Sequence, residues 1–236
     1  MRRIYLGLHG ALAPDTYSEG NRAINQLRTI LGGQVMDWPA ASTAYPPPGQ
    51  ISDKAGHYVG YLPTQAMRYL IAEIHAAEAA NEPSSVRLYG WSTGAIMLCA
   101  LARELGRCPE IARKERRRVD VCVAFDPLWS LEFFKVDPPE IPANVRRWVC
   151  VRQNADGDRP PPVPLPNDRF WQGMRLWPEK PKKTRYDEFN VANGDIVGNP
   201  GFTLFVNTAF QYPTNHPRVP VIAFDAALGI LGSGSV

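Results

Sequence analysis

The most informative stretch of the sequence is Val86-Arg87-Leu88-Tyr89-Gly90-Trp91-Ser92-Thr93-Gly94-Ala95. It begins as an apolar strand pattern, passes through a G-x-S-x-G pentapeptide, and continues into a helical pattern of apolar residues. A serine at a sharp strand-to-helix turn adopts a strained backbone, and glycines two residues before and after it prevent clashes. The hydroxyl group then lies at a helix N-terminus, above the edge of the sheet. We predict that Ser92 is an activated nucleophile; the alternative is a packing turn whose glycines permit close approach of helix and sheet.

Short apolar strands alternate with amphipathic helices on both sides of this stretch. Strands are predicted at residues 3–8, 34–38, 85–89, 119–125 and 146–152. They are rich in β-branched and aromatic residues with little polar alternation, which is typical of strands covered on both faces. Helices are predicted at residues 21–31, 64–80 and 93–105, with Thr64 as the N-cap of the second. The alternation predicts an α/β fold, a three-layer α/β/α sandwich with a mostly parallel central sheet, in a single domain over residues 1–236.

Two stretches rich in proline interrupt this pattern. Residues 40–61 are expected to form a long loop, and residues 153–215 form a longer insertion that holds Phe170, Trp171 and Trp177. A structureless insertion of this length in a compact domain usually has a function. We expect a lid or cap in which these three aromatic residues, together with Trp91, bind the substrate. A surface excursion without a role is the alternative.

A serine hydroxyl becomes a good nucleophile only when a base takes its proton, and the sequence holds four histidines. His216 follows every predicted strand, which is where the chain order Ser–Asp–His places the base. We therefore predict His216 as the base, and a turn histidine before Pro217 is the alternative. His75 is interpreted as a solvated helix residue, His57 as a loop residue, and His9 as the end of the first strand.

Two positions compete for the acid that orients this histidine. Asp126 directly follows the apolar strand at residues 119–125, and Pro127 fixes the turn after it. Asp156 and Asp158 follow the next predicted strand, in a polar segment with a solvated character. Both positions are carboxyl ends of parallel strands, where such sheets assemble their sites. We favour Asp126, and Asp156 or Asp158 stays the alternative.

Two backbone N–H groups are needed to stabilise the negative charge that develops on the reacting oxygen. The residue after the nucleophile, Thr93, supplies one of them. The other comes from the loop after an early strand, where His9-Gly10-Ala11 follows the first strand and the glycine lets the backbone approach. We predict Ala11 as the second donor, with Gly10 as the second choice. A simple glycine turn that leaves the strand is the alternative.

Charge and composition exclude other classes of partner. The chain has 26 basic and 23 acidic residues, a formal net charge of +3, which is too balanced for a nucleic-acid-binding protein. The one basic run, residues 113–118, predicts a solvated helix end, with transient contact to an anion or a membrane surface as the alternative. The four cysteines show no metal-ligand spacing, and we expect neither a metal ion nor an organic cofactor.

Features that report on location favour the cytoplasm slightly. Three of the four cysteines lie inside apolar runs and none requires a disulfide, so a reducing compartment is compatible with the sequence. No apolar run approaches the roughly 20 residues of a membrane span. The N-terminal Met1-Arg2-Arg3 and the apolar residues after it imitate a signal peptide. A histidine and two glycines interrupt this apolar part, so we predict a first strand instead.

Three of these segments together resemble the α/β-hydrolase superfamily, in particular its lipase-like branch. His9-Gly10 is similar to the lipase oxyanion motif, and Gly90-Trp91-Ser92-Thr93-Gly94 is similar to the nucleophile elbow. Phe125-Asp126-Pro127 is similar to the Asp-Pro segment that carries the acid in many lipases. The strand–helix order extends the resemblance from residue 3 to residue 152. It implies a minimal α/β-hydrolase fold, the size of a cutinase or an esterase.

The resemblance also implies a serine hydrolase that cleaves a carboxylic ester, of a lipid or of another small molecule. Ser92, His216 and Asp126 would form its triad, and Ala11 and Thr93 its oxyanion hole. Because this fold hosts many chemistries, a catalytically silent binding or structural protein on the same scaffold is our second hypothesis.

Overall fold

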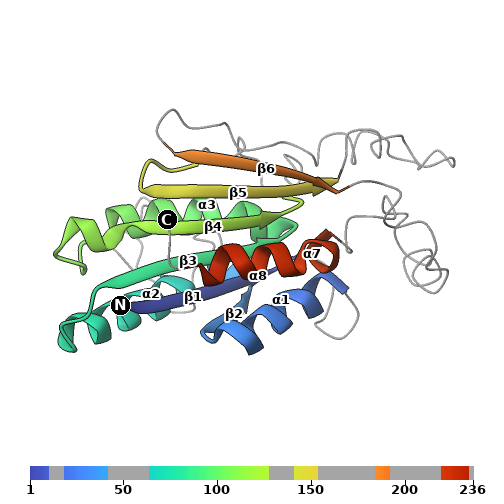
Figure 1. Ribbon diagram of the computed structural model, residues 1–236. Helices are drawn as coiled ribbons and strands as arrows, with labels where there is room; N and C mark the ends of the chain where they lie inside the picture. Colours follow the sequence, from blue (N-terminus) through green and yellow to red (C-terminus); the bar gives the residue numbers. More distant parts are fainter. Residues whose placement is uncertain (11–18, 42–63, 128–140, 154–183, 192–218, 234–236) are drawn as a thin grey trace, which may run out of the picture.

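The computed structural model describes residues 1–10, 19–41, 64–127, 141–153, 184–191 and 219–233. These residues form a six-stranded sheet of order β2-β1-β3-β4-β5-β6, in which every neighbouring pair is parallel (Figure 1). The strands are β1 (Arg2–His9), β2 (Gln34–Asp37), β3 (Ser84–Trp91), β4 (Val119–Phe125), β5 (Val145–Gln153) and β6 (Arg185–Val191). The predicted parallel sheet is confirmed, and all five predicted strands are present with ends that shift by no more than two residues.

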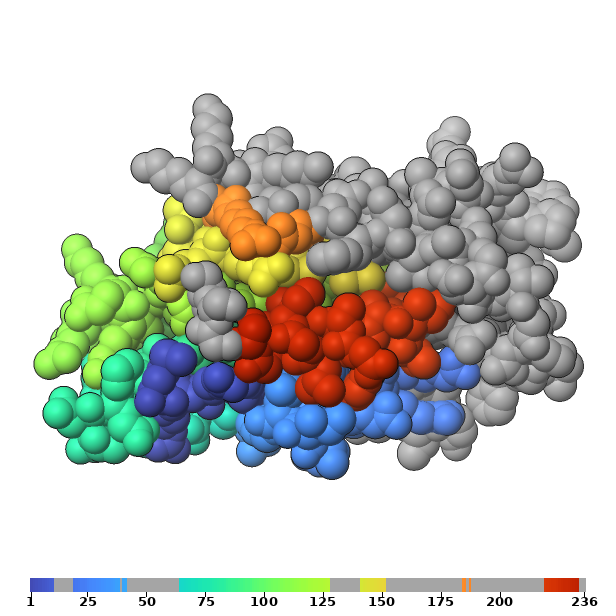
Figure 2. Space-filling view, in the orientation of Figure 1, coloured from blue at the N-terminus to red at the C-terminus, as the bar shows by residue number. Residues whose placement is uncertain are grey.

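Helices cover both faces of the sheet. One face carries α2 (Gln65–Ala79) and α3 (Thr93–Arg107), which bury a core that includes Leu6, Leu88 and Trp148. The other carries α1 (Glu19–Leu31), α7 (Val219–Ile222) and α8 (Phe224–Gly232). Figure 2 shows α8 lying beside α1 across this second face. The three-layer α/β/α architecture is therefore confirmed. The described part of the chain contains no helix that is both long and apolar enough to cross a membrane.

The predicted helices at residues 21–31, 64–80 and 93–105 correspond to α1, α2 and α3. Thr64 caps α2 as expected, because its Oγ1 accepts a hydrogen bond of 3.3 Å from the N–H of Met67. No helix was predicted after residue 215, so α7 and α8 are additions. α8 is apolar on most sides and shows no clear polar face, which leaves little helical periodicity to recognise.

The stretch at residues 153–215 contributes a strand to the sheet, against expectation. β6 pairs in parallel with β5 from Arg147 opposite Arg185 to Gln153 opposite Val191. The expectation of a structureless insertion is wrong for residues 185–191, whose four charged or amide side chains hid the strand pattern. Charged residues are common on strands at the edge of a sheet, where they discourage further pairing. The rest of this stretch lies outside the described residues, and its role as a lid stays a prediction.

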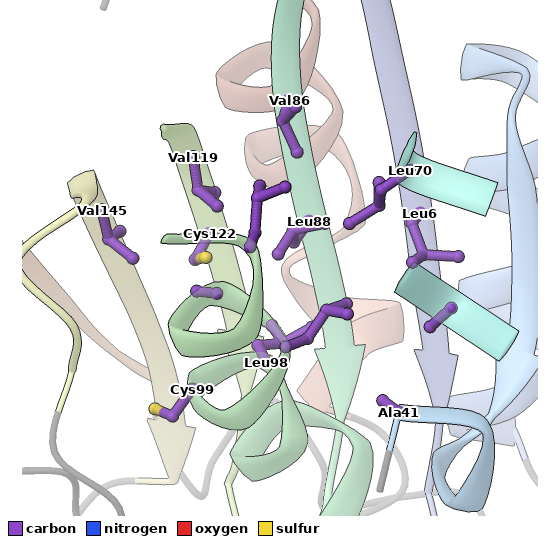
Figure 3. Close-up of a cluster of buried hydrophobic side chains, with 14 of the residues drawn as sticks. Leu6, Ala41, Leu70, Val86, Leu88, Leu98, Cys99, Val119, Cys122 and Val145 are labelled. Atoms are coloured by element: carbon purple, nitrogen blue, oxygen red, sulfur yellow. The ribbon is translucent and has the colours of Figure 1, made fainter. Parts of the chain in front are cut away.

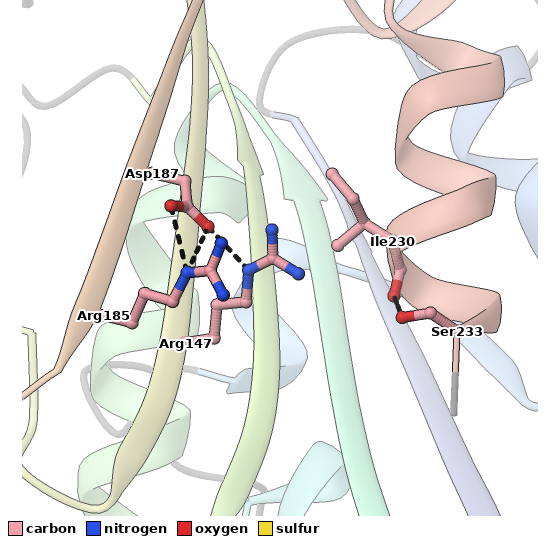
Figure 4. A network of polar contacts seen from close by, with 5 residues as sticks. All are labelled: Arg147, Arg185, Asp187, Ile230 and Ser233. Atoms are coloured by element: carbon pink, nitrogen blue, oxygen red, sulfur yellow. Dashed lines mark hydrogen bonds and ion pairs between the residues drawn. The ribbon is translucent and has the colours of Figure 1, made fainter. Parts of the chain in front are cut away.

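An ion-pair network ties β6 to its neighbour. Arg147 Nε of β5 donates a 2.6 Å hydrogen bond to Asp187 of β6, and Arg185 Nε donates one of 3.2 Å to the same carboxylate (Figure 4). Burial alone would raise the pKa of Asp187, but the hydrogen bonds and charges of the two arginines outweigh it and lower that pKa. The edge strand is thus joined to the sheet by charge as well as by backbone hydrogen bonds.

The core between the sheet, α2 and α3 is apolar and includes cysteines. Figure 3 shows Cys122 of β4 and Cys99 of α3 among valine and leucine side chains. All four cysteines are buried and none forms a disulfide, and burial raises the pKa of the Cys99 and Cys122 thiols. Cys99 and Cys122 therefore act as small apolar residues, because a protonated, enclosed thiol is a poor nucleophile.

The second face buries an arginine. Arg87 of β3 is 0% exposed; its Nε donates to Ser85 Oγ at 3.2 Å, and its Nη1 donates to the carbonyl of Leu231 in α8. The hydroxyl of Tyr5 donates to the same carbonyl at 3.3 Å. Desolvation lowers the pKa of Arg87. Two strands thereby hold the last turn of α8, whose carbonyls lack partners within the helix.

Candidate active site

The carboxyl edge of the sheet brings Ser92, Asp126 and His9-Gly10 together. Ser92 follows β3 and its N–H donates a 3.0 Å hydrogen bond to the carbonyl of Phe125, the last residue of β4. Asp126 comes next, and its N–H donates a 2.6 Å hydrogen bond to Val151 of β5. On the other side of β3, Leu8 of β1 lies opposite Gly90. Three neighbouring strands therefore deliver predicted site residues to one edge.

Ser92 has the strained backbone that its pentapeptide predicts. Its φ is 58° and its ψ is −126°, at the junction between β3 and α3. Such a conformation costs a non-glycine residue on the order of 1–3 kcal/mol and persists where the surroundings impose it. The Ser92 side chain makes no capping hydrogen bond to α3, although serine at this position ordinarily does. The hydroxyl is thus left for another use.

Gly90 and Gly94 are required by packing. A β-carbon on Gly90 would lie 2.9 Å from the carbonyl carbon of Gly94, and one on Gly94 would lie 2.6 Å from the carbonyl oxygen of Leu8. The glycines therefore do permit a close approach of α3 to the sheet, as the alternative interpretation of a packing turn requires. It does not account for Ser92, because glycine would occupy a positive φ there at lower cost. The serine side chain is what distinguishes a reactive turn from a packing turn.

Asp126 shares this unusual geometry. It is 1% exposed, its φ is 40°, and it directly follows the β4 residue that receives the Ser92 N–H. A buried carboxylate in a strained turn, one strand from the serine, suits an acid that orients a base. The rival acids Asp156 and Asp158 lie outside the described residues, and so does the predicted base His216. The assignment of the triad therefore stays a prediction.

Thr93 is the first residue of α3 and is buried. The first N–H groups of a helix have no partner within it and carry the positive end of the helix dipole, so they suit a developing oxyanion. Ala11, the other predicted donor, lies outside the described residues. The N–H of Gly10, our second choice, donates a 3.0 Å hydrogen bond to Asn21 Oδ1, which makes it a weaker candidate.

Trp91 packs inside the protein. It is 4% exposed, belongs to the core of the second face, and fills the space beside Gly10 and Gly20, where a β-carbon would come within 2.7 Å of its ring. This position indicates that Trp91 shapes the wall behind Ser92, and its predicted contact with substrate is untested. Phe170, Trp171 and Trp177 lie outside the described residues.

Neither described histidine is placed to serve Ser92. Both ring nitrogens of His9 have partners, Nδ1 at 3.1 Å from Asp37 Oδ1 and Nε2 at 3.2 Å from Asn25 Oδ1. His75 is hydrogen-bonded at 3.1 Å to the carbonyl of Glu110, beyond the far end of α3. Because α3 has 15 residues, that end is roughly 22 Å from Ser92. These contacts leave His57 and His216 as candidates for the base.

Sequence reasoning missed the polar residues around His9-Gly10. Asn21 and Asn25 are four residues apart on α1 and both face the end of β1. Asparagine is a mediocre helix former, so two of them at this spacing are a usable signal of side chains with a purpose. Within the described ranges, no three His, Cys, Asp or Glu side chains gather closely enough to hold a metal ion.

No family model matches the chain, and no curated protein matches it either. Among solved structures, it is similar to a protein of unknown function from Agrobacterium tumefaciens, named as a candidate α/β hydrolase. The identity is 11% over 98% of this chain and 86% of that chain, with a TM-score of 0.44.

Two further solved structures show a comparable similarity. A candidate hydrolase of the α/β superfamily from Xanthomonas campestris pv. campestris is 13% identical over 98% of this chain and 99% of that chain, with a TM-score of 0.39. A cutinase-like protein from Cryptococcus sp. is 14% identical over 99% and 97%, with a TM-score of 0.35. Because the TM-scores are low, we base the proposed activity on the geometry of this chain.

Proposed function

We propose that this protein is a serine hydrolase that cleaves a carboxylic ester through an acyl-enzyme. The observation that carries the proposal is the φ of 58° at Ser92, at the start of α3 and beside Asp126. A serine in this strained position at the start of a helix, with a hydroxyl not used for capping, fits a nucleophile at a strand-to-helix turn better than a packing turn, although the described residues leave it only 6% exposed.

In the proposed reaction, His216 takes the proton of the Ser92 hydroxyl while Oγ attacks the ester carbonyl carbon. The electron pair of the C=O bond moves onto oxygen, where the N–H groups of Thr93 and Ala11 stabilise the charge. When the tetrahedral intermediate collapses, the alcohol leaves with the proton from His216. Water then loses a proton to His216 and attacks the acyl-enzyme. When the second tetrahedral intermediate collapses, the acid is released and Ser92 Oγ regains its proton from His216.

Asp126 has the role of holding the imidazole in the working tautomer and stabilising it when it is protonated. Its burial supports this role, because a carboxylate interacts more strongly with a charged imidazole when water is excluded. The α3 N-terminus contributes in the same way, since its dipole favours negative charge beside Thr93. The proposed substrate is a lipid ester or another small acyl ester, handled without a metal ion or an organic cofactor.

Active-site labelling tests the proposal. A fluorophosphonate should modify the wild-type protein once per molecule and leave Ser92→Ala unmodified. Ser85→Ala is the matched control, since Ser85 is a buried serine of β3, the strand that leads to Ser92, and contacts Arg87. This variant should label like the wild type. Absence of labelling in a folded wild type would instead support the catalytically silent binding protein. Labelling that persists in Ser92→Ala would show that another residue is the nucleophile.

A further inference from the structure

Two asparagines of α1 hold two consecutive residues at the end of β1. Asn21 Oδ1 accepts the 3.0 Å hydrogen bond from the N–H of Gly10, and Asn25 Oδ1 lies 3.2 Å from His9 Nε2. Asp37, which ends β2, contacts the other nitrogen of the His9 ring at 3.1 Å. One face of α1 therefore holds the backbone and the side chain at the point where the chain leaves the sheet.

The residues held in this way form part of the wall around Ser92. A β-carbon on Gly10 would lie 2.9 Å from Ser92 Cβ and 2.7 Å from the Trp91 ring. A β-carbon on Gly94, in the first turn of α3, would come at least as close to the carbonyl oxygens of Leu8 and His9. The end of β1 is thus wedged between α1 on one side and the start of α3 on the other, with Gly10 directly against Ser92.

We propose that Asn21 is a positioning residue for the Ser92 site. By accepting the N–H of Gly10, Asn21 fixes the peptide that borders Ser92. It acts through Gly10 and touches no reacting atom. The inference rests on the proposed function, since positioning matters only if Ser92 reacts.

The burial of Asn21 supports a specific role. Asn21 is 0% exposed and lies in the first two turns of α1, where an apolar residue would fill the space without a polar group. Burying an amide is unfavourable unless it is hydrogen-bonded. The acceptor is directed at a backbone N–H that borders the nucleophile. A displacement of about 1 Å at such a position reduces a reaction rate by as much as about 10².

Three variants test the role of Asn21. Asn21→Leu removes the acceptor while it keeps the number and branching of the side-chain heavy atoms, and Asn21→Asp keeps an oxygen acceptor in either protonation state. Asn144→Leu is the matched control, because Asn144 Nδ2 donates 2.8 Å hydrogen bonds to the carbonyls of Ala102 and Arg117 before β5, at the opposite edge of the sheet. The readouts are kcat and KM for p-nitrophenyl acetate, the rate of fluorophosphonate labelling, and the melting temperature.

We expect Asn21→Leu to lower kcat and the labelling rate by about tenfold or more while KM changes by less than about threefold. Asn21→Asp should recover kcat to within about threefold of the wild type. Asn144→Leu should lower the melting temperature and leave kcat unchanged. If Asn21→Leu does not fold, the comparison of Asn21→Asp with Asn21→Ser, which shortens the side chain and loses the contact, gives the same test.

Two results would overturn the inference. The first is an Asn21→Leu or Asn21→Ser protein with wild-type kcat, and the second is a loss of kcat that tracks the melting temperature equally in the Asn144 control. Failure of the proposed function is recognised separately, because a wild type that neither labels nor hydrolyses the ester gives no rate for Asn21 to change.

Discussion

Polar groups are buried both at the carboxyl edge of the sheet, around Ser92, and in the parts of β3 and α3 that lie away from this edge. The two regions bury them in different ways. Away from the edge, Arg87 and the half-buried Glu104 are held by hydrogen bonds to Ser85, Leu231 and Thr64. At the edge, Ser92 and Asp126 have positive φ angles, and the serine side chain does not cap its helix. Polar residues that are buried without a strained backbone stabilise the fold. Polar residues that are buried on a strained backbone indicate a site whose geometry serves chemistry.

The largest effect is expected at Asp126. Asp126→Asn should lower kcat by at least about 10², because the amide cannot hold the base in its working tautomer. Asp120→Asn is the matched control, since Asp120 lies near the other end of β4 in a 3.4 Å ion pair with Arg146, and it should change kcat little. Asp156→Asn and Asp158→Asn should stay within about tenfold of the wild type. If Asp156 or Asp158 is the acid instead, steady-state kinetics would show the larger loss of kcat in the variant of that residue and the smaller loss in Asp126→Asn.

Arg87 should affect stability and leave chemistry unchanged. Arg87→Ala removes the hydrogen bonds to Ser85 and Leu231 and leaves a cavity, so unfolding in urea should show a loss of about 3 kcal/mol. Arg87→Met keeps most of the volume and should lose about 1 kcal/mol. Both folded variants should label with fluorophosphonate at the wild-type rate. A lower labelling rate in either Arg87 variant would contradict the claim that Arg87 serves stability alone.

Glu104 provides a test by pH. Burial raises the pKa of Glu104 to about 7, although its hydrogen bond from Thr64 acts in the opposite direction. The folded protein therefore disfavours the ionised form, and wild-type stability should fall as the pH rises from about 4.5 to about 7. Glu104→Gln cannot ionise, so it should be more stable than the wild type above pH 7, by about 1 kcal/mol because water screens a half-exposed group.

The advantage of Glu104→Gln should disappear below about pH 4.5, where both the folded and the unfolded wild type are protonated. Melting temperatures at pH 4.5 and pH 8 measure it. An advantage that is equal at both pH values would mean that the ionisation of Glu104 is not the cause.

The smallest effect concerns the strain at Ser92 itself. Ser92→Gly relieves the positive φ of 58° and should raise stability by about 0.5–1 kcal/mol while it abolishes labelling. Ser85→Gly, within β3 and without such a φ, should lower stability by a similar amount. A Ser92→Gly protein that is less stable than the wild type would show that the turn is relaxed, and would weaken the argument from strain.

The pentapeptide and the apolar periodicity were sufficient to predict most of the sheet and the position of Ser92. β4 was predicted with the same ends that the structure shows, because an apolar run from Val119 to Phe125, with Asp120 as its one charged residue, has few other interpretations. β6 could not be predicted in this way, since the charged residues Arg185 and Asp187 disguise it. Its position depends on Arg147 in a strand about 40 residues earlier.

Local pattern thus determined β1 to β5, α1 to α3, and the position of a strained serine between β3 and α3. Those features depend on interactions between residues close in sequence, such as the clash with the backbone of Gly94 that Gly90 avoids. The burial of Arg87 against α8 and of Asn21 against Gly10 was decided only by the tertiary structure. These contacts join residues 144 and 11 positions apart, and a hydrogen-bond partner that is brought in by packing leaves no periodic trace in the sequence.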